Sequence, residues 1–283
     1  MISTALDESI VILRSINMIS VITPVYNSKD FITSCIQNVI DQGCPDIEHI
    51  IVDGGSTDGT LELIRQYADE YPHIYWISEK DKGQSDAMNK GISIANGELL
   101  GVLNADDYYE PGVVNRAVQL FQNLPEPSFL AGNCNIWNHV DELIGVNKPS
   151  HLKLEQLLKG WCVHPFPYNP SAYFYHASLH QSAGLFDINE HYAMDLEFIL
   201  RAVQFANVYY FDEAWGNFRV HQDTKTFRSK SNSEPMARMN RIMRHYRKQL
   251  NPVSRLKVAC VYEYYSDENI RKVKQGLKSA FGF

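Results

Sequence analysis

The 283-residue chain lacks the features that mark several broad classes of protein. Its five cysteines form no C-x-x-C pair and are odd in number, so a reduced cytoplasmic setting fits best and each cysteine is expected in the core. The most apolar stretch, residues 9–26, is interrupted by Arg14 and Asn17 and falls short of the ~20 apolar residues that span a bilayer. No basic n-region begins the chain, so no signal peptide is predicted.

The sequence also lacks an overall excess of positive charge. It has 33 acidic and 26 basic residues, a formal charge of −7, which argues against a general nucleic-acid binder. Hydrophobic residues make up 45% and charged residues 21%, so a mostly disordered chain is excluded. The charge is uneven, because residues 219–283 carry +10 and residues 1–218 carry −17. This asymmetry indicates two working surfaces.

Apolar strands and amphipathic helices alternate over residues 18–122. Strands are predicted at 18–27, 48–55, 73–78 and 98–107, and helices at 28–41, 56–71, 83–97 and 110–124. This alternation predicts an α/β fold with a mostly parallel central sheet and helices on both faces. Residues 125–180 are less regular and rich in aromatics, and further helices are predicted at 191–206, 234–250 and 254–280.

Polar residues follow each of the four predicted strands. The clusters are Tyr26 with Asn27, and the ranges 53–58, 79–82 and 104–107. Ligands of such sheets bind at the carboxyl ends of the strands. The four clusters therefore predict a binding site at one edge of the sheet.

Two adjacent carboxylates, Asp106 and Asp107, end the last of these clusters. Such a pair repels unless a divalent cation lies between it and an anionic substrate, and Mg²⁺ or Mn²⁺ is commonly held by carboxylates together with phosphate oxygens. The alternative is that both residues cap the next helix, which has Pro111 in its first turn. The position at a strand end favours the cation.

The segment IIVDGGSTDGT ends the second strand at Asp53. Two glycines let the backbone approach a ligand closely, and Asp53 offers acceptors for a ribose hydroxyl or a base N–H. Alternatively, Gly54 and Gly55 form only a turn, and Ser56 or Asp58 caps the helix. The segment is neither a G-x-G-x-x-G fingerprint nor a Walker loop.

The segments SVITPVYN, IIVDGGSTDGT, EKDKGQSDAMNKGI and GVLNADD resemble, in their order and spacing, the family 2 glycosyltransferases of GT-A fold. The resemblance covers about residues 18–221. It implies one nucleotide-sugar-binding domain that transfers a sugar with inversion and uses Mg²⁺ or Mn²⁺. The chain is thus divided into an N-terminal extension (1–17), a GT-A domain (18–221) and a basic helical C-terminal segment (222–283).

The resemblance also implies site residues by position. The donor site would be lined by Thr23, Pro24, Tyr26, Asp53, Glu79, Asp81, Gly83, Asn89, Asn104 and Asp106. The metal would be held by Asp106, Asp107 and His221. The chain departs from the family pattern where Asn104 replaces the first acid of Asp-x-Asp and where Gly54 replaces a frequent Asp. The nucleotide base is therefore left open, with a UDP-sugar favoured.

The segment GLFDINEHYAMDLEFILR places Asp195 where the family has its general base. Residues two apart on a helix point to opposite sides, and Glu197 can pair with Arg201 at i+4, which leaves Asp195 to face the cleft. Asp195 would then remove the proton of an acceptor hydroxyl as that hydroxyl attacks C1 of the sugar. The alternative is that Asp195 caps its helix.

Aromatic residues crowd the segment 160–179 around His164. Aromatic faces stack on sugar rings but also fill cores, and most of these side chains are expected in the core. Trp161 and His164 are predicted to lie at the region that binds the acceptor, which the resemblance implies to be a saccharide or a lipid-linked molecule.

Arginines recur at i+3 steps in the C-terminal segment, at positions 238, 241, 244 and 247. They lie beside an apolar stripe of Met239, Ile242, Met243, Tyr246 and Leu250. This pattern is typical of a helix that lies on anionic lipid, here at the inner face of the membrane. The alternative, which we favour, is a solvated helix that packs on the main domain.

The resulting hypothesis is a cytoplasmic inverting glycosyltransferase. It would move a sugar from a nucleotide-sugar donor to a saccharide or lipid-linked acceptor in polysaccharide or glycolipid assembly. One alternative is a non-catalytic, transferase-like binding module, suggested by Asn104. The other is a sugar nucleotidyltransferase, whose Gly- and Arg/Lys-rich triphosphate loop is missing from the first strand–helix turn.

Overall fold

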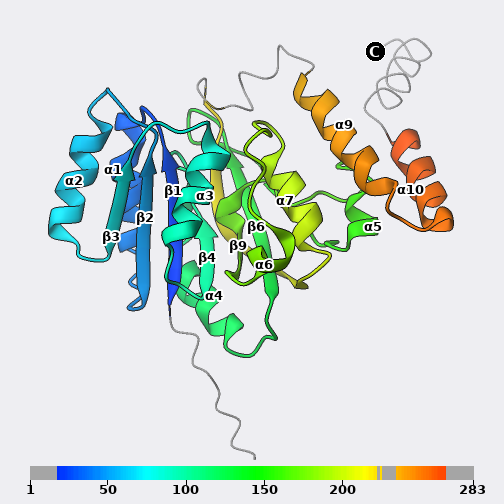
Figure 1. Ribbon diagram of the computed structural model, residues 1–283, viewed down its shortest axis with the longest axis horizontal. Helices are drawn as coiled ribbons and strands as arrows, with labels where there is room; N and C mark the ends of the chain where they lie inside the picture. The colour runs from blue at the N-terminus through cyan, green and yellow to red at the C-terminus, as the bar shows by residue number, and fades with distance from the viewer. Residues whose placement is uncertain (1–17, 222–223, 225–233, 266–283) are drawn as a thin grey trace, which may run out of the picture.

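The computed structural model describes residues 18–221, Thr224 and residues 234–265 (Figure 1). The predicted N-terminal extension and the part of the last predicted helix beyond residue 265 lie outside the described residues. Within the described part of the chain, no helix is both long and apolar enough to cross a membrane.

The four predicted strands form the parallel half of one sheet. Strand β1 (Ile19–Val25) lies between β2 (Ile47–Asp53) and β4 (Leu99–Val102), and β3 (Ile74–Ser78) pairs with the other side of β2. Every residue of β1 and β2 is buried, as expected for strands covered on both faces. The prediction of an α/β fold is confirmed.

The rest of the sheet is not mostly parallel. Its strands are β5 (Tyr108–Tyr109), β6 (Ser128–Trp137), β7 (Leu143–Asn147), β8 (Tyr173–His176) and β9 (Asn207–Arg219). The strand order is β3-β2-β1-β4-β8-β6-β9-β5, with β7 beside β6. Strand β8 is antiparallel to both β4 and β6, whereas β6 and β9 are parallel. The parallel prediction thus holds for the first half of the sheet only, since none of the later strands was predicted and three of them lie in the irregular region 125–180.

Helices cover both faces of the sheet, as predicted (Figure 1). One face packs against α1 (Lys29–Ile40), α2 (Thr60–Glu70) and α4 (Val113–Phe121). The other face packs against α3 (Gln84–Ile94), α6 (Leu179–Ala183), α7 (Met194–Ala202) and α9 (Glu234–Arg247). The short helices α5 (Leu154–Leu157) and η1 (Pro170–Ala172), and α10 (Pro252–Tyr264), complete the described elements.

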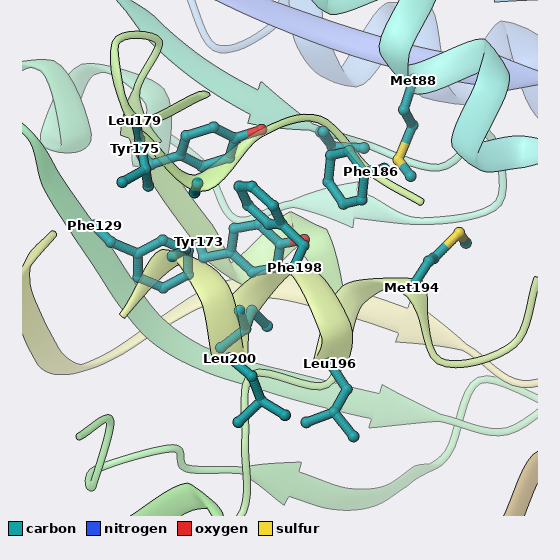
Figure 2. Close-up of a cluster of buried hydrophobic side chains, with 14 of the residues drawn as sticks. Met88, Phe129, Tyr173, Tyr175, Leu179, Phe186, Met194, Leu196, Phe198 and Leu200 are labelled. Atoms are coloured by element: carbon teal, nitrogen blue, oxygen red, sulfur yellow. The ribbon is translucent and has the colours of Figure 1, made fainter. Parts of the chain in front are cut away.

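An aromatic cluster fixes the position of α7 on the sheet (Figure 2). The ring of Phe198 lies 4.5 Å from that of Phe186 and 5.3 Å from that of Tyr175, between ring centroids. Tyr173, Phe174 and Tyr175 are fully buried, and Phe166 and Tyr168 are partly buried against core clusters, which confirms that most aromatics of segment 160–179 are core residues. Truncating a buried Phe to Ala typically costs about 3–5 kcal/mol, so this cluster holds the first turn of α7 firmly in place.

Helix α9 uses its apolar stripe inside the protein. Met243 and Tyr246 are buried, and Met239, Ile242 and Leu250 pack against the same core. Of the two predicted alternatives, the structure therefore shows the helix that packs on the main domain. The apolar stripe is used in this packing and is not open to lipid.

The cysteine prediction holds for three of the five residues. Cys35, Cys44 and Cys134 are buried, but Cys162 and Cys260 are exposed, so the expectation that all five lie in the core is wrong. Both exposed residues lie outside the regular strand–helix alternation, in a loop and on the outer side of α10.

Candidate active site

The polar clusters meet at one edge of the sheet because the strands that carry them end side by side. Val25, Asp53 and Ser78 are register partners at the ends of β1, β2 and β3. The Gly54 N–H donates to the carbonyl of Val25, and the Leu103 N–H donates to that of Ile22. The loops that follow all four strands thus start from neighbouring positions, as the sequence predicts.

The first two loops are tied together by side chain to backbone hydrogen bonds. The Asn27 N–H donates to Ser56 Oγ at 2.7 Å, and the Thr57 N–H donates to Asn27 Oδ1 at 2.9 Å. Asn27 has φ +46°, a conformation that asparagine tolerates better than most residues. These bonds hold the loops after β1 and β2 together at the edge of the sheet where the strands end.

Three of the four predicted donor-site residues on or next to β1 and β2 are buried. Thr23 is fully buried, and its hydroxyl lies 2.8 Å from Nε2 of His49. Pro24 is buried in β1. Asp53 is fully buried and accepts hydrogen bonds from the Ser78 hydroxyl at 2.6 Å and from two backbone N–H groups of the following turn. Tyr26, in contrast, is 61% exposed and lies at the edge of the sheet.

The loop after β3 carries the predicted residues Glu79, Asp81 and Gly83. Glu79 forms an ion pair of 2.7 Å with Lys90 of α3. Oδ1 of Asp81 accepts the Gly83 N–H at 2.8 Å, which closes the loop just before α3. Gly83 has φ +115°, and a Cβ there would lie 3.2 Å from the ring of His191, so the position requires glycine.

The side-chain amide of Asn89 is hydrogen-bonded to the backbone of Phe186. Its amide nitrogen donates to the Phe186 carbonyl at 2.8 Å, and its amide oxygen accepts the Phe186 N–H at 2.9 Å. Both polar atoms are thus engaged with the backbone that leads to α7. These two bonds fix the orientation of Asn89, and its contact with the donor stays a prediction.

Asp107 is the buried member of the acidic pair. Its Oδ2 accepts hydrogen bonds from the side-chain amides of Asn104 at 2.9 Å and Asn169 at 2.7 Å, and its Oδ1 accepts the Arg219 N–H. Burial and the charge of Asp106 raise the pKa of Asp107 well above its usual value, although these three donors act in the opposite direction. Both carboxylate oxygens of this predicted metal ligand are thus engaged within the protein.

Asp106 is paired with His221, which joins the end of β4 to the end of β9. Oδ2 of Asp106 lies 3.0 Å from Nε2 of His221, and their side chains are 26% and 18% exposed. The imidazole also stacks on the ring of Phe31, with 4.8 Å between centroids. The structure thus brings together two of the three predicted metal ligands, one oxygen and one nitrogen donor.

These two donors fit a divalent cation that takes its other ligands from a substrate. Carboxylate oxygen and imidazole nitrogen both suit Mn²⁺, and substrate phosphates commonly complete such sites. No group of three or more His, Cys, Asp or Glu side chains gathers at metal-binding spacing among the residues described. Among the described residues, Asp106 and His221 are thus the two candidate donors that lie together.

Asp195 lies in the first turn of α7 and does not cap it. The residue before the helix is Ala193, and the Tyr192 and Ala193 N–H groups both donate to Glu190 Oε1 at 3.0 Å. Oδ1 of Asp195 instead accepts a hydrogen bond of 2.9 Å from the Tyr173 hydroxyl. Glu190, which the sequence analysis did not single out, thus binds the two N–H groups that directly precede the helix.

Glu197 is engaged elsewhere, as predicted. Its carboxylate pairs with Arg201 at 2.6 Å and accepts a hydrogen bond from the Tyr246 hydroxyl of α9 at 3.0 Å. Its side chain is only 16% exposed, so this pair holds α7 and α9 together instead of lying in open solvent.

The predicted acceptor residues lie in the loop between α5 and η1. Trp161 is 39% exposed and meets the ring of Phe166 at 4.9 Å between centroids. The ring of His164 lies tilted against that of His151, with 4.3 Å between centroids, and burial together with this neighbour lowers the pKa of His164. The exposed indole is an available platform for a sugar ring.

Comparison with known proteins bears on this site. A family model described as Glycosyl transferase family 2 matches residues 20–156. The uncharacterized glycosyltransferase MT1564 of Mycobacterium tuberculosis is 35% identical over 190 residues, which cover 65% of this chain and 68% of that protein. Chondroitin synthase of Escherichia coli is 32% identical over 110 residues, covering 39% of this chain and 16% of that protein. The chain thus spans a small part of this longer relative.

A solved structure shares the fold. The S. aureus protein TarS, residues 1–349, in complex with UDP-GlcNAc matches with a TM-score of 0.67 and 18% identity, over 88% of this chain and 73% of that chain. At this identity the likeness concerns the arrangement of the elements.

Proposed function

The chain belongs to glycosyl transferase family 2 and is a glycosyltransferase, and we propose that it transfers a sugar from a UDP-sugar with inversion. The acceptor in this proposal is a saccharide or a lipid-linked molecule in polysaccharide or glycolipid assembly. Support for the donor comes from the TarS complex with UDP-GlcNAc, and support for the pathway class from the relationship to chondroitin synthase.

The observation that carries the proposal is the environment of Asp195. Its carboxylate lies in the first turn of α7, is neither the cap of that helix nor the partner of Arg201, and is held by the Tyr173 hydroxyl. In the proposed reaction Asp195 takes the proton of the acceptor hydroxyl while the oxygen forms a bond to C1 of the donor sugar. The bond from C1 to the diphosphate breaks with its electron pair on the leaving oxygen, so no covalent intermediate with the enzyme forms.

In this proposal Asp106 and His221 hold the divalent cation together with the donor diphosphate. The cation would supply Lewis-acid neutralisation of the leaving group. Asp107 instead orients Asn104 and Asn169 from inside the protein. The catalytic domain of the proposal spans residues 18–221, with α9 and α10 packed against it.

The test compares Asp195→Asn with the matched control Glu197→Gln. Both replace an acid in the first turn of α7 by its amide, and only the first is proposed to touch the reacting atoms. We expect Asp195→Asn to lose at least ~10²-fold in release of UDP from UDP-GlcNAc with Mn²⁺, with donor binding unchanged in a thermal-shift assay. Glu197→Gln should lose stability and keep the activity.

Two results would contradict the proposal. Full activity in Asp195→Asn excludes this residue as the base. A wild-type chain that binds a sugar nucleotide from a panel of UDP-, GDP- and dTDP-sugars but cleaves none of them with Mn²⁺ is a binding module and not an active transferase.

A further inference from the structure

Asp53, the acid at the end of β2, has no exposed surface for a ligand. It is fully buried, and its two oxygens accept hydrogen bonds from the Ser78 hydroxyl and from the N–H groups of Gly55 and Ser56. Asp53 therefore stabilises the turn after β2. Recognition of the nucleotide base at this edge of the sheet requires another side chain.

A second carboxylate lies directly against that turn. A Cβ added to Gly54 would lie 2.5 Å from Oδ2 and 3.2 Å from Cγ of Asp81, so the Asp81 carboxylate occupies the space that a side chain at position 54 would fill. Oδ1 of Asp81 is held by the Gly83 N–H at 2.8 Å. Oδ2 has no hydrogen-bond partner among the described residues.

The ring of Tyr26 lies beside Gly54 as well. Its Cδ2 would lie 3.4 Å from a Cβ at position 54, and the side chain is 61% exposed. An exposed aromatic ring, a bare backbone at Gly54 and a carboxylate oxygen thus converge from the ends of β1, β2 and β3. A flat heterocycle that stacks on the ring would present its edge to the carboxylate.

We propose that Asp81 selects the base of the donor nucleotide, by accepting the N3–H of uracil at Oδ2. The inference rests on the proposed function and deepens it at the donor site. A carboxylate only accepts hydrogen bonds, so it pairs with the protonated N3 of uracil and opposes cytosine, whose N3 is itself an acceptor. The two bases have the same shape, so hydrogen bonding alone separates them.

The experiment measures the affinities of the full chain for UDP and CDP by titration calorimetry in the presence of Mn²⁺. We expect wild type to bind UDP about tenfold or more tightly than CDP, the size of effect that a hydrogen bond to a charged group supplies. N3-methyl-UDP should lose the same factor. In Asp81→Asn, whose amide can donate as well as accept, the ratio of UDP to CDP affinity should fall toward one.

A relocation variant tests the geometry itself. Gly54 is outside the left-handed region, so its backbone accepts a side chain once Asp81 no longer fills the space. We expect Asp81→Gly to lose the preference for UDP, and Gly54→Asp combined with Asp81→Gly to regain most of it. Asp86→Asn is the matched control, since Asp86 lies five residues further along and accepts from Lys82 N–H, away from the turn.

The outcomes separate this inference from the proposed function. If wild type binds no nucleotide, the proposed donor is wrong. If wild type binds UDP but Asp81→Asn and Asp81→Gly keep its preference over CDP with unchanged melting temperatures, the inference is overturned and the transferase stands. Tighter binding of GDP than UDP by wild type overturns the choice of uracil, and a double variant that regains nothing overturns the role of a carboxylate in this corner.

Discussion

The buried hydroxyl of Tyr173 donates a hydrogen bond of 2.9 Å to Oδ1 of Asp195, and so joins the centre of the sheet to the first turn of α7. Burial and the charge of Asp195 raise the pKa of Tyr173 well above its usual range, so the phenol stays protonated and remains a donor. This bond orients the carboxylate that we propose as the base, which makes Tyr173 a positioning residue.

Tyr173→Phe should therefore slow catalysis without weakening donor binding. Loss of a charge-assisted hydrogen bond leaves the Asp195 carboxylate less well oriented and its ionised form less stabilised. We expect kcat to fall about tenfold, the dissociation constant for UDP-GlcNAc to stay constant, and the acid limb of the pH–rate profile to move to higher pH. Steady-state kinetics across pH, with calorimetric titration of the donor, measure all three.

Tyr175→Phe is the control for the loss of a buried hydroxyl. Tyr175 is two residues along in β8, is equally buried, and its hydroxyl meets Nε2 of His180 at 3.2 Å instead of Asp195. A similar loss of stability with the activity and pH profile intact is expected. Equal kinetic effects of the two variants would mean that Tyr173 acts through packing alone.

The proposed metal pair of Asp106 and His221 predicts different consequences for changes at His221 and at Asp107. His221→Ala removes one of the two donors in the pair, so the increase in melting temperature that Mn²⁺ gives in the presence of UDP should shrink. Asp107→Asn leaves that pair in place and disturbs the buried bonds with Asn104 and Asn169. We expect it to lower stability while keeping the Mn²⁺ effect, and the reverse pattern would assign the metal to Asp107.

The first half of the fold follows from the sequence because each strand there is a short apolar run bounded by a helix with a clear apolar stripe. The strands end in polar clusters, and parallel pairing then brings the clusters together without further information. The second half does not follow, because β8 reads YFYH and is buried at every position. An all-buried aromatic strand shows neither alternation nor helical spacing, so nothing local separates it from a loop.

The site divides in the same way. Asp106, His221 and Asp195 could be named as candidates from the sequence because their positions match motifs. Which carboxylate oxygens have no hydrogen-bond partner could not be predicted from the sequence. Asp53 and Asp81 look equally available in the sequence, yet Asp53 is fully buried and accepts the Ser78 hydroxyl, whereas Asp81 keeps an oxygen without a described hydrogen-bond partner. Such differences arise from contacts between residues 25 or more positions apart, such as the bond from Ser78 to Asp53.

His49 makes stability depend on pH. Its ring is fully buried beside Thr23, and burial, with a smaller contribution from His73, lowers its pKa from 6.5 to about 3. Between these values the unfolded chain binds a proton that the folded chain does not. The contribution is therefore fully present above pH 6.5 and is lost as the pH falls toward 3, at about 1.4 kcal/mol per pH unit.

Replacing His49 by Gln should remove this slope. Chemical denaturation at pH 7.5, 6.0 and 4.5 would measure the free energy of unfolding of both proteins. We expect the variant to be less stable at pH 7.5, because the packing around a buried side chain changes, but to lose less stability than wild type on acidification. Parallel pH profiles for the two proteins would show that other groups govern the acid sensitivity.

The cationic face of α9 predicts binding to anionic lipid, without a role for the apolar stripe. Arg241, Arg244 and Lys248 are exposed and line a surface hollow with His245 and Ala237, whereas Arg247 is buried against the ring of Tyr262. Each exposed cation contributes about 1 kcal/mol near an anionic membrane. Wild type should therefore float with vesicles that contain phosphatidylserine and remain behind with neutral ones.

Reversal of two charges tests this contact better than truncation does, because removal of the segment would also strip Met243, Tyr246 and Val258 from the core. We expect Arg241→Glu with Arg244→Glu to reduce flotation at least about tenfold while UDP-GlcNAc cleavage in solution is kept. The control pair Arg116→Glu with Lys148→Glu changes the net charge equally on other elements, where both cations pair with acids. If both pairs reduce flotation alike, net charge and not α9 governs binding, and a wild type that stays behind with every vesicle shows that this face does not serve a membrane.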